Sequence, residues 1–358
     1  MRWWLPVFKE KEVEFLKIIL DAMGGDFAPE APVLGAIDAA KDFGAQITLV
    51  GRGQEILEVL KKNGIANLPD GLEICHAEDV VDMHDDPAKV IHKRKNSSMV
   101  VGLRMLAEGK GDAFVSAGST GALLSGATLI VKRVKGIRRA AMAPSMPTKA
   151  GHKVVICDCG ANAECTPEFL LQFGLVASAY AKHTLGVADP KVGLLNIGTE
   201  DSKGTQLQKD AYALLTAAGE KGLLNFAGNV EARAVPLGEV DVVVCDGFSG
   251  NVLLKSIEGT AMFLGSSVSA MFKKSFVSKL AAMLVMKDIK AFKKLLDYRE
   301  IGGTQFVGIK KPVIKAHGSS DRRAFYNAVR QAVDAANNNT AEELEAALKQ
   351  ISIKKEKA

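Results

Sequence analysis

The stretch IILDAMGGDFAPE, residues Ile18–Glu30, joins a strand to a helix and decides the class of the fold. Ile18–Asp21 predicts a buried strand, Gly24 and Gly25 interrupt it, and apolar spacing from about Ala31 to Phe43 predicts a helix. The alternation recurs in strands at Ile47–Gly51, Leu72–Cys75 and Ala113–Gly118 and a helix at Gln54–Asn63. Repeated β-α succession implies a largely parallel sheet with helices on both faces, so the sequence predicts an α/β fold.

Three later apolar runs stop abruptly at polar and glycine residues. They are KVVICDCGAN at residues 153–162, KVGLLNIG at 191–198 and VDVVVCDGFSGN at 240–251. In open α/β sheets, ligands bind at the carboxyl ends of the strands. The recurrence of Asn, Asp, Ser and Thr with glycine at these ends therefore predicts an active site there.

Size and charge narrow the class of protein. The chain has 358 residues, with 46 Lys and Arg against 41 Asp and Glu, a formal net charge of +5. This mild excess suits anionic partners without requiring nucleic acid. Because single hydrophobic cores usually stop growing at roughly 250–300 residues, we expect a divided core. No stretch predicts a membrane span, and residues 1–17 are expected to form an N-terminal extension.

The motifs of common cofactor sites are incomplete. Gly51 and Gly53 begin a dinucleotide fingerprint, but Ile56 stands where its third glycine or alanine should be. Lys203 precedes Gly204, whereas the lysine of a P-loop follows its glycine. No G-x-S-x-G motif of a serine hydrolase occurs. We therefore expect no cofactor.

Cysteine spacing favours a reduced protein without a metal site. The five cysteines are an odd number in a chain lacking a secretory signal, which is typical of the cytoplasm. Cys157, Cys159 and Cys165 lack the paired C-x-x-C spacing of zinc sites. We expect Cys157 and Cys159 to be buried on one face of a strand.

A basic amphipathic segment extends from Met271 to Leu296. Its apolar residues recur at three- and four-residue intervals, which predicts a helical hairpin over residues 270–298. Seven lysines surround this apolar stripe: Lys273, Lys274, Lys279, Lys287, Lys290, Lys293 and Lys294. This composition is typical of an interfacial helix on an anionic membrane surface, although a dimer-interface or core helix is the alternative. Thr340 with Glu343 forms a capping-box pattern that predicts the start of a last helix, and a C-terminal helix and tail are expected over residues 341–358.

Seven motifs together resemble the phosphate acyltransferase family of bacterial phospholipid synthesis. They are LDAMGGDFAPE (20–30), SAGSTGALL (116–124), DCGANAECTPEFLLQF (158–173), LNIGTEDSKGT (195–205), NFAGNVEAR (225–233), DGFSGNVLLK (246–255) and AHGSSD (316–321). They occur in family order over Ile18–Ala336. The sequence departs from the family pattern at Ser119, Cys159 and Ser249, where the family usually has Asn, Val and Thr.

The resemblance implies a fold, an activity and partners. The fold is a three-layer αβα sandwich like isocitrate and isopropylmalate dehydrogenases, formed by one domain over residues 18–340 and assembled as a homodimer. The activity is transfer of a fatty acyl group from the thioester of acyl carrier protein to inorganic phosphate. The acyl phosphate then passes to a membrane glycerol-3-phosphate acyltransferase, which implies peripheral membrane attachment of a cytoplasmic enzyme.

This chemistry selects candidate residues. Phosphate is already ionised and a thiolate leaves readily, so positioning and oxyanion stabilisation should dominate over strong acid or base catalysis. Three residues are predicted to be catalytic: Lys203, Asn251 and, ranked below them, His317. The predicted substrate-binding residues are Gly24, Gly25, Asp26, Ser116, Ser119, Thr120, Gly121, Asn162, Thr205, Asn229, Asp246 and Ser319. Two other functions remain open: a phosphotransacetylase-like enzyme that uses acyl-coenzyme A, and a non-catalytic membrane scaffold for lipid-synthesis enzymes.

Overall fold

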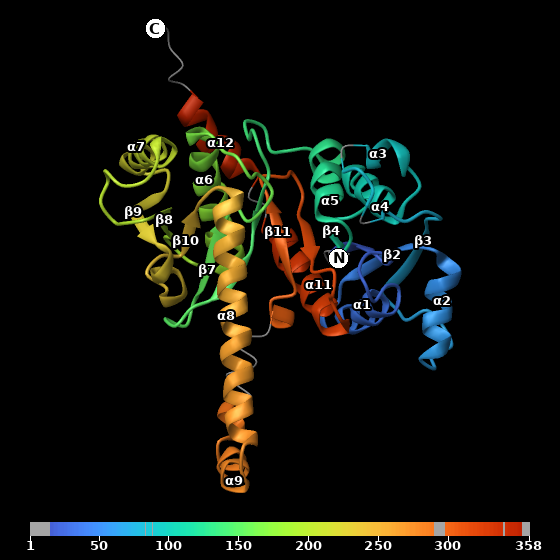
Figure 1. The fold of residues 1–358 in the computed structure, drawn as a ribbon. Coiled ribbons are helices and arrows are strands. Elements are labelled where there is room, and N and C mark those ends of the chain that lie inside the picture. The colour runs from blue at the N-terminus through green and yellow to red at the C-terminus, as the bar shows by residue number, and fades with distance from the viewer. Residues whose placement is uncertain (1–14, 83, 88, 290–297, 339–340, 353–358) are drawn as a thin grey trace, which may run out of the picture.

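Two sheets organise the chain in the computed structural model, which describes residues 15–82, 84–87, 89–289, 298–338 and 341–352 (Figure 1). The first sheet has seven strands in the order β3-β2-β1-β4-β12-β11-β5. The second has five strands in the order β6-β7-β10-β8-β9. The mixed α/β class and the division of the core are therefore confirmed, although the strands form two sheets and not one.

The first sheet is parallel through its centre. Its strands are β1 (Lys17–Asp21), β2 (Gln46–Gly51), β3 (Leu72–His76), β4 (Ala113–Ser116), β5 (Ala141–Ala143), β11 (Gly303–Val307) and β12 (Val313–Ala316). β12 pairs parallel with β4, and β11 runs antiparallel to both of its neighbours. The carboxyl ends of β1, β4 and β12 consequently lie at the same edge of the sheet.

Helices cover both faces of the first sheet. One face packs against α1 (Glu30–Phe43), α2 (Gly53–Lys62) and α11 (Arg322–Asn337). The other packs against α3 (Val90–Lys93), α4 (Ser98–Ala107), α5 (Thr120–Gly126) and the π-helical turn Ala127–Val131. α1 and α11 can approach closely because residue 35 is a glycine. A Cβ at Gly35 would lie only 2.6 Å from Cβ of Phe325.

The second sheet also has helices on both faces. Its strands are β6 (Ser145–Pro147), β7 (Lys153–Cys157), β8 (Lys191–Asn196), β9 (Asn225–Glu231) and β10 (Val242–Val244). α6 (Pro167–Leu185) and α7 (Gln206–Glu220) cover one face, and α12 (Ala341–Ser352) packs against α6. The 3₁₀ turn Ala232–Leu237 and the first turns of α8 (Gly247–Lys273) cover the other.

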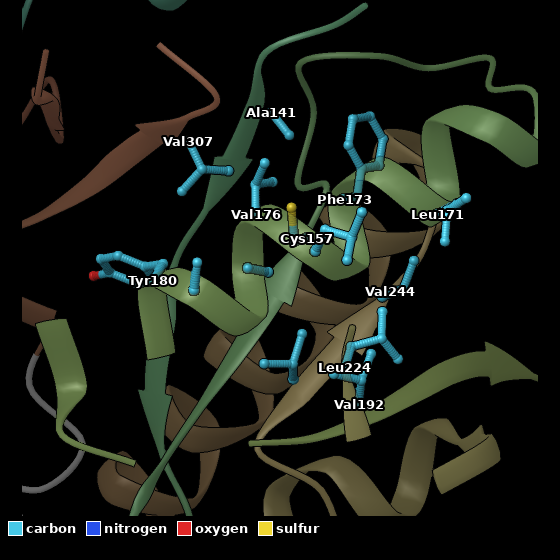
Figure 2. Close-up of a cluster of buried hydrophobic side chains, with 14 of the residues drawn as sticks. Ala141, Cys157, Leu171, Phe173, Val176, Tyr180, Val192, Leu224, Val244 and Val307 are labelled. Carbon is cyan, nitrogen blue, oxygen red and sulfur yellow. The ribbon is translucent and has the colours of Figure 1, made fainter. Parts of the chain in front are cut away.

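One apolar cluster connects the two sheets. Figure 2 shows Phe173, Val176 and Tyr180 of α6 packed between strands, with Val307 of β11 on one side and Val192 of β8 on the other. All five side chains are buried. Burying apolar surface contributes about 25 cal/mol per Å², so this cluster fixes how the sheets sit relative to each other.

The two neighbouring cysteines do not share a face. Cys157 packs with Val155 in the cluster under α6, whereas Cys159 packs with Val154 and Ile156 on the opposite side of the sheet. The prediction of one shared face is wrong because β7 ends at Cys157, and the alternation of side chains in a strand does not continue beyond its end. All five cysteines are free thiols, as expected.

α8 is much longer than the sequence pattern suggested. It begins at Gly247, extends well beyond the rest of the chain and ends near α9 (Phe276–Leu284) at its far tip (Figure 1). The predicted hairpin over 270–298 therefore begins as the end of a 27-residue helix, and residues 290–297 lie outside the described part of the chain. Thr340, the predicted cap of the last helix, also lies outside it. A further 3₁₀ turn, Tyr298–Glu300, precedes β11.

The described helices are all too short or too polar to cross a bilayer. The exposed apolar side chains of α8 and α9 are instead spread along the projecting segment. Phe263 is 68% exposed, Phe276 82% and Leu284 85%. Single exposed apolar residues are ordinary, but such a series on one projecting element is typical of an interaction surface.

Candidate active site

The loops after β1 and β4 meet around a buried carboxylate. Asp21 is 1% exposed, and Ser116 Oγ donates to its Oδ2 at 2.7 Å. Ser116 Oγ also accepts from Gly118 N at 3.1 Å. Burial raises the pKa of Asp21, and the hydrogen bonds from Ser98 and Ser116 oppose that rise. This network holds the two loops against each other.

Gly24 and Gly25 permit this close approach. A Cβ on Gly24 would lie 2.7 Å from Gly118 N and 2.8 Å from Asp21 Oδ2, and Gly25 has a φ of +100° that favours glycine. Asp26 N then donates to Gly318 O, in the loop after β12, at 2.8 Å. The predicted residues of these three loops therefore lie together in the fold.

The loop after β4 leads directly into α5. Ser119 is 7% exposed and precedes the helix without a capping hydrogen bond from its side chain. Thr120 faces a cavity described below. A Cβ on Gly121 would lie 2.9 Å from Cγ of Pro87, so this glycine serves packing between two segments. Of these three predicted residues, Thr120 is the one that can contact a ligand in the cavity.

Asp158, just beyond β7, organises the facing edge of the second sheet. Its carboxylate accepts from Met142 N at 2.8 Å, from Asn162 N at 2.6 Å and from Asn162 Nδ2 at 3.0 Å. Asn162 Nδ2 also donates to Ala140 O at 2.9 Å. The side chain of Asn162 is thus occupied in holding the loop, although it was predicted to bind substrate.

The DGFSGN motif packs the start of α8 against the Asp158 loop. Asp246 caps the helix, since its carboxylate accepts from Ser249 N and from Ser249 Oγ, each at 2.8 Å. A Cβ on Gly247 would lie 2.6 Å from Asn162 O, and one on Gly250 would lie 2.0 Å from Asp158 O. Both glycines therefore bring the helix onto the loop backbone, and the next residue, Asn251, is held at this edge.

Lys203, Thr205 and Asn229 form a separate group at β8 and β9. Lys203 is exposed, and its carbonyl accepts from Asn196 Nδ2 at 3.1 Å. Thr205 caps α7 through a capping box with Gln208. Asn229 Nδ2 donates to Glu200 O at 2.7 Å. The structure places these three at the end of the second sheet, apart from the cavity.

A cavity of about 580 Å³ lies between the two sheets and α8. Three predicted residues line it: Thr120 after β4, Asn251 of α8 and His317 after β12. Three lysines that the sequence analysis did not select, Lys149, Lys255 and Lys315, line it as well. One part of the cavity is therefore polar and cationic.

Much of the remaining wall of the cavity is apolar, although Ser145, Thr148, Glu258 and Thr304 also line it. The apolar part is formed by Met142, Pro144, Met146, Leu254, Ile257, Ala261 and Ile301. A mostly apolar pocket with a few convergent polar groups is the common form of a small-molecule site. The arrangement suits a ligand with a long apolar chain and an anionic or polar head.

The charges around His317 favour its neutral form. Its pKa is lowered by burial and by the nearby ammonium groups of Lys255 and Lys315. Its Nδ1 lies 2.8 Å from Ser319 Oγ, which fixes the orientation of the ring. Lys255 in turn forms an ion pair with Glu258 at 2.7 Å. His317 is therefore available as a neutral hydrogen-bonding group near pH 7.

Cys159 also lines the cavity, yet its chemistry is unfavourable for catalysis. The side chain is 4% exposed, and burial raises the pKa of its thiol far above the ordinary range. Because the thiolate is the reactive form of cysteine, Cys159 is not a credible covalent acyl acceptor. The site instead suits direct attack by a second substrate.

Replacing Cys159 by valine should leave turnover within about threefold of the parent, because the side chain acts by packing alone. Steady-state thioester consumption measures this. Cys75, which lies away from the cavity, provides a matched Cys75→Val control. A loss of turnover confined to Cys159→Val would show that the thiol takes part in the reaction.

Comparison with known proteins identifies the family. Residues 16–343 match the family model described as fatty acid synthesis protein. Curated proteins named phosphate acyltransferase match over nearly their whole length. The one from Alkaliphilus oremlandii is 46% identical over 92% of this chain and 96% of its own, and the one from Bacillus licheniformis is 43% identical over 94% and 99%. The chain belongs to the phosphate acyltransferase family. It is therefore an acyltransferase, as its motifs indicated.

Solved structures of other enzymes have a similar fold. A phosphotransacetylase from Streptococcus pyogenes aligns with a TM-score of 0.60 at 21% identity, over 92% of this chain and 95% of its own. A 4-hydroxythreonine-4-phosphate dehydrogenase from Salmonella typhimurium aligns with a TM-score of 0.51 at 14% identity, over 90% and 99%. At these identities the likeness concerns the fold alone.

Proposed function

We propose that this enzyme transfers a fatty acyl group from the thioester of acyl carrier protein to inorganic phosphate, giving acyl phosphate for phospholipid synthesis. The observation that carries this proposal is the cavity, in which a cationic part adjoins an apolar wall. The cationic part suits phosphate and the thioester carbonyl, and the apolar wall suits the acyl chain. The names of the curated relatives support acyl transfer to phosphate.

The residues of the cavity suit a mechanism based on positioning. A phosphate oxygen attacks the thioester carbonyl, the C–O bond forms, and a tetrahedral oxyanion collapses with loss of the thiolate. Asn251 is the proposed amide donor to that oxyanion, because its neutral side chain stabilises negative charge without neutralising the phosphate. Thr120 and His317 are proposed hydrogen-bond donors to phosphate, and Gly24, Gly25 and Ser116 shape the loops around them.

Lys203 remains a proposed catalytic residue of the loop after β8. It is exposed and does not line the cavity, so it would have to contact a part of the thioester substrate that lies outside the cavity. Thr205, Asn229 and Asp246 have structural hydrogen bonds that account for their presence. We therefore rank Asn251 first among the predicted catalytic residues.

The identity of the thioester distinguishes the proposal from its closest alternative. That alternative is a phosphotransacetylase-like enzyme that uses acyl-coenzyme A, and a phosphotransacetylase has a similar fold. The test compares kcat/KM for the same acyl group on acyl carrier protein and on coenzyme A. Preference for the carrier protein supports the proposal, and a clear preference for coenzyme A would contradict it. A non-catalytic scaffold would consume neither thioester, whatever the phosphate concentration.

The exposed apolar side chains of the projecting helices α8 and α9 suit dimer formation and binding to a membrane surface. We propose a homodimer that buries the exposed apolar side chains of α8, including Met262 at 75% and Phe263 at 68% exposure. We propose that α9 binds an anionic membrane surface and thereby delivers acyl phosphate to a membrane glycerol-3-phosphate acyltransferase. The likeness to isocitrate dehydrogenase and a cytoplasmic location are further parts of this proposal.

Changing both Leu280 and Leu284 to Glu should weaken binding to phosphatidylglycerol vesicles by at least about tenfold, since two exposed leucines would no longer enter the interface. Sedimentation measures bound protein at several salt concentrations. Each nearby lysine contributes around 1 kcal/mol on anionic lipid, so binding of the parent should fall steeply as salt is added.

A matched double variant provides the control. Leu57 and Leu129 are 49% and 60% exposed and belong to other elements, so changing both to Glu should leave vesicle binding unaltered. Equal binding by the Leu280→Glu/Leu284→Glu variant and the parent, with the same salt dependence, would show that α9 is not the anchor.

A further inference from the structure

Lys315 is a buried lysine at the centre of the first sheet. It lies on β12, which pairs with β4 on one side and β11 on the other, so strands on both sides fix its backbone. The residue is 8% exposed and lines the cavity. Lysine is almost never this buried without a partner, because an ammonium group taken out of water loses hydration that a charged or polar partner must replace.

The hydrogen bonds of the Lys315 ammonium group compensate only part of the hydration that it loses on burial. Nζ donates to Ala117 O at 3.3 Å and to Ala316 O. An ammonium group has three protons, and both acceptors are neutral carbonyl oxygens. Within the described residues, no carboxylate forms an ion pair with Lys315. The positive charge therefore faces the cavity without a protein anion bound to it.

The neighbouring charges keep Lys315 protonated near neutral pH. Burial lowers its pKa to about 8, while Asp21 and Asp26 oppose that lowering. Another titratable group that faces it, His317, is biased toward the neutral form because burial and the ammonium groups of Lys255 and Lys315 lower its pKa. Lys255, across the cavity on α8, is already paired with Glu258. Lys149, the third lysine of the lining, is exposed to solvent. Lys315 is thus the cation of the cavity best suited to an anionic ligand.

We infer that Lys315 binds the attacking phosphate, its ammonium group donating to a phosphate oxygen in the cationic part of the cavity. This inference rests on the proposed acyl transfer to phosphate. A neutral thioester oxygen would leave the buried charge uncompensated, whereas a phosphate anion offsets it and gains a charge-assisted hydrogen bond. The same contact orients the phosphate toward the carbonyl near Asn251. Lys315 would therefore be a binding residue for phosphate more than for the acyl thioester.

The test replaces Lys315 by methionine, which has a similar length and no charge. Because a hydrogen bond to a charged group is removed, the KM for phosphate should rise about 10–100-fold while the KM for the thioester changes by less than about threefold. Lys311→Met is the matched control, since Lys311 Nζ also donates to a backbone carbonyl, Gly111 O at 3.0 Å, but lies outside the cavity. This control should retain the parent values.

Calorimetric titration with inorganic phosphate separates this inference from the proposed function. Phosphate should bind the parent and Lys311→Met equally, and Lys315→Met much more weakly. If the parent binds phosphate through Lys315 but never consumes the thioester, the proposed function fails, and only the phosphate-binding role of Lys315 stands. If the parent consumes the thioester while folded Lys315→Met keeps the parent KM for phosphate, the inference fails alone.

The pH dependence of the parent provides a test that needs no variant. The Lys315 ammonium is present below its pKa of about 8 and is lost above it, so the KM for phosphate should rise as pH increases from about 8 to 10. The KM for the thioester should stay nearly constant over the same range. A KM for phosphate that is flat across this range overturns the inference even if Lys315→Met does not fold.

Discussion

Replacing Asn251 by alanine should lower kcat about 10²–10³-fold, the usual cost of removing one oxyanion donor. The side chain lines the cavity on the second turn of α8, and Asp246, not Asn251, caps that helix. The loss should therefore fall on the chemical step and leave the fold intact. Steady-state kinetics with saturating thioester and phosphate measure kcat, and circular dichroism checks the fold.

Thr260→Ala provides the control for the Asn251 variant. Thr260 lies on the same helix, does not line the cavity, and donates to Ser256 O within the helix at 2.8 Å. Its removal should change kcat by less than about threefold. A fall in kcat below threefold for Asn251→Ala would refute its assignment. Lys203→Ala in the same assay tests the second predicted residue, and a large loss there would show that the loop after β8 reaches the substrate.

Replacing Gly250 by alanine should destabilise the protein by about 2 kcal/mol or more, a typical cost of forcing atoms into a packed interior. The added Cβ would lie 2.0 Å from Asp158 O and 2.7 Å from Cys245 Sγ, and the backbone oxygen cannot rotate away as a side chain would. Helix α8 must then shift, which also displaces Asn251. Urea denaturation should show a lower midpoint, and kcat should fall with it.

Gly259→Ala separates this clash from the general effect of removing a glycine from a helix. Gly259 lies on the same helix, and a Cβ there meets nothing within 4 Å. Alanine should stabilise the exposed helix by about 0.5–1 kcal/mol, so the two variants should shift the urea midpoint in opposite directions. Midpoints that move together would contradict the packing of α8 onto the Asp158 loop.

The local strand and helix pattern was predictable because it depends on short-range periodicity. Ile18–Asp21 and Ala31–Phe43 read as strand and helix, and they correspond to β1 and α1 within a residue. The start of α8 was not predicted, since two glycines close to Asp246 are typical of a loop. They are tolerated in the helix because the Asp158 backbone approaches there, a contact that depends on residues far apart in the sequence.

The candidate site was predicted in part for the same reason. Thr120, Asn251 and His317 follow strand ends, where polar residues indicate binding, and all three line the cavity. Lys315 carries no such signal, because a lysine in a short strand is ordinarily exposed. Its burial results from pairing with β4 and β11, which the sequence pattern does not specify. A buried charge is recognisable only after the strands are assembled.

The fate of phosphate tests the central claim most directly. Purified enzyme is incubated with a fatty acyl thioester of acyl carrier protein and labelled inorganic phosphate, and both released thiol and labelled acyl phosphate are measured. The account predicts one acyl phosphate for each thiol released, and no thiol release when phosphate is omitted. Thiol release at an equal rate without phosphate, with no label in the acyl product, would contradict acyl transfer to phosphate.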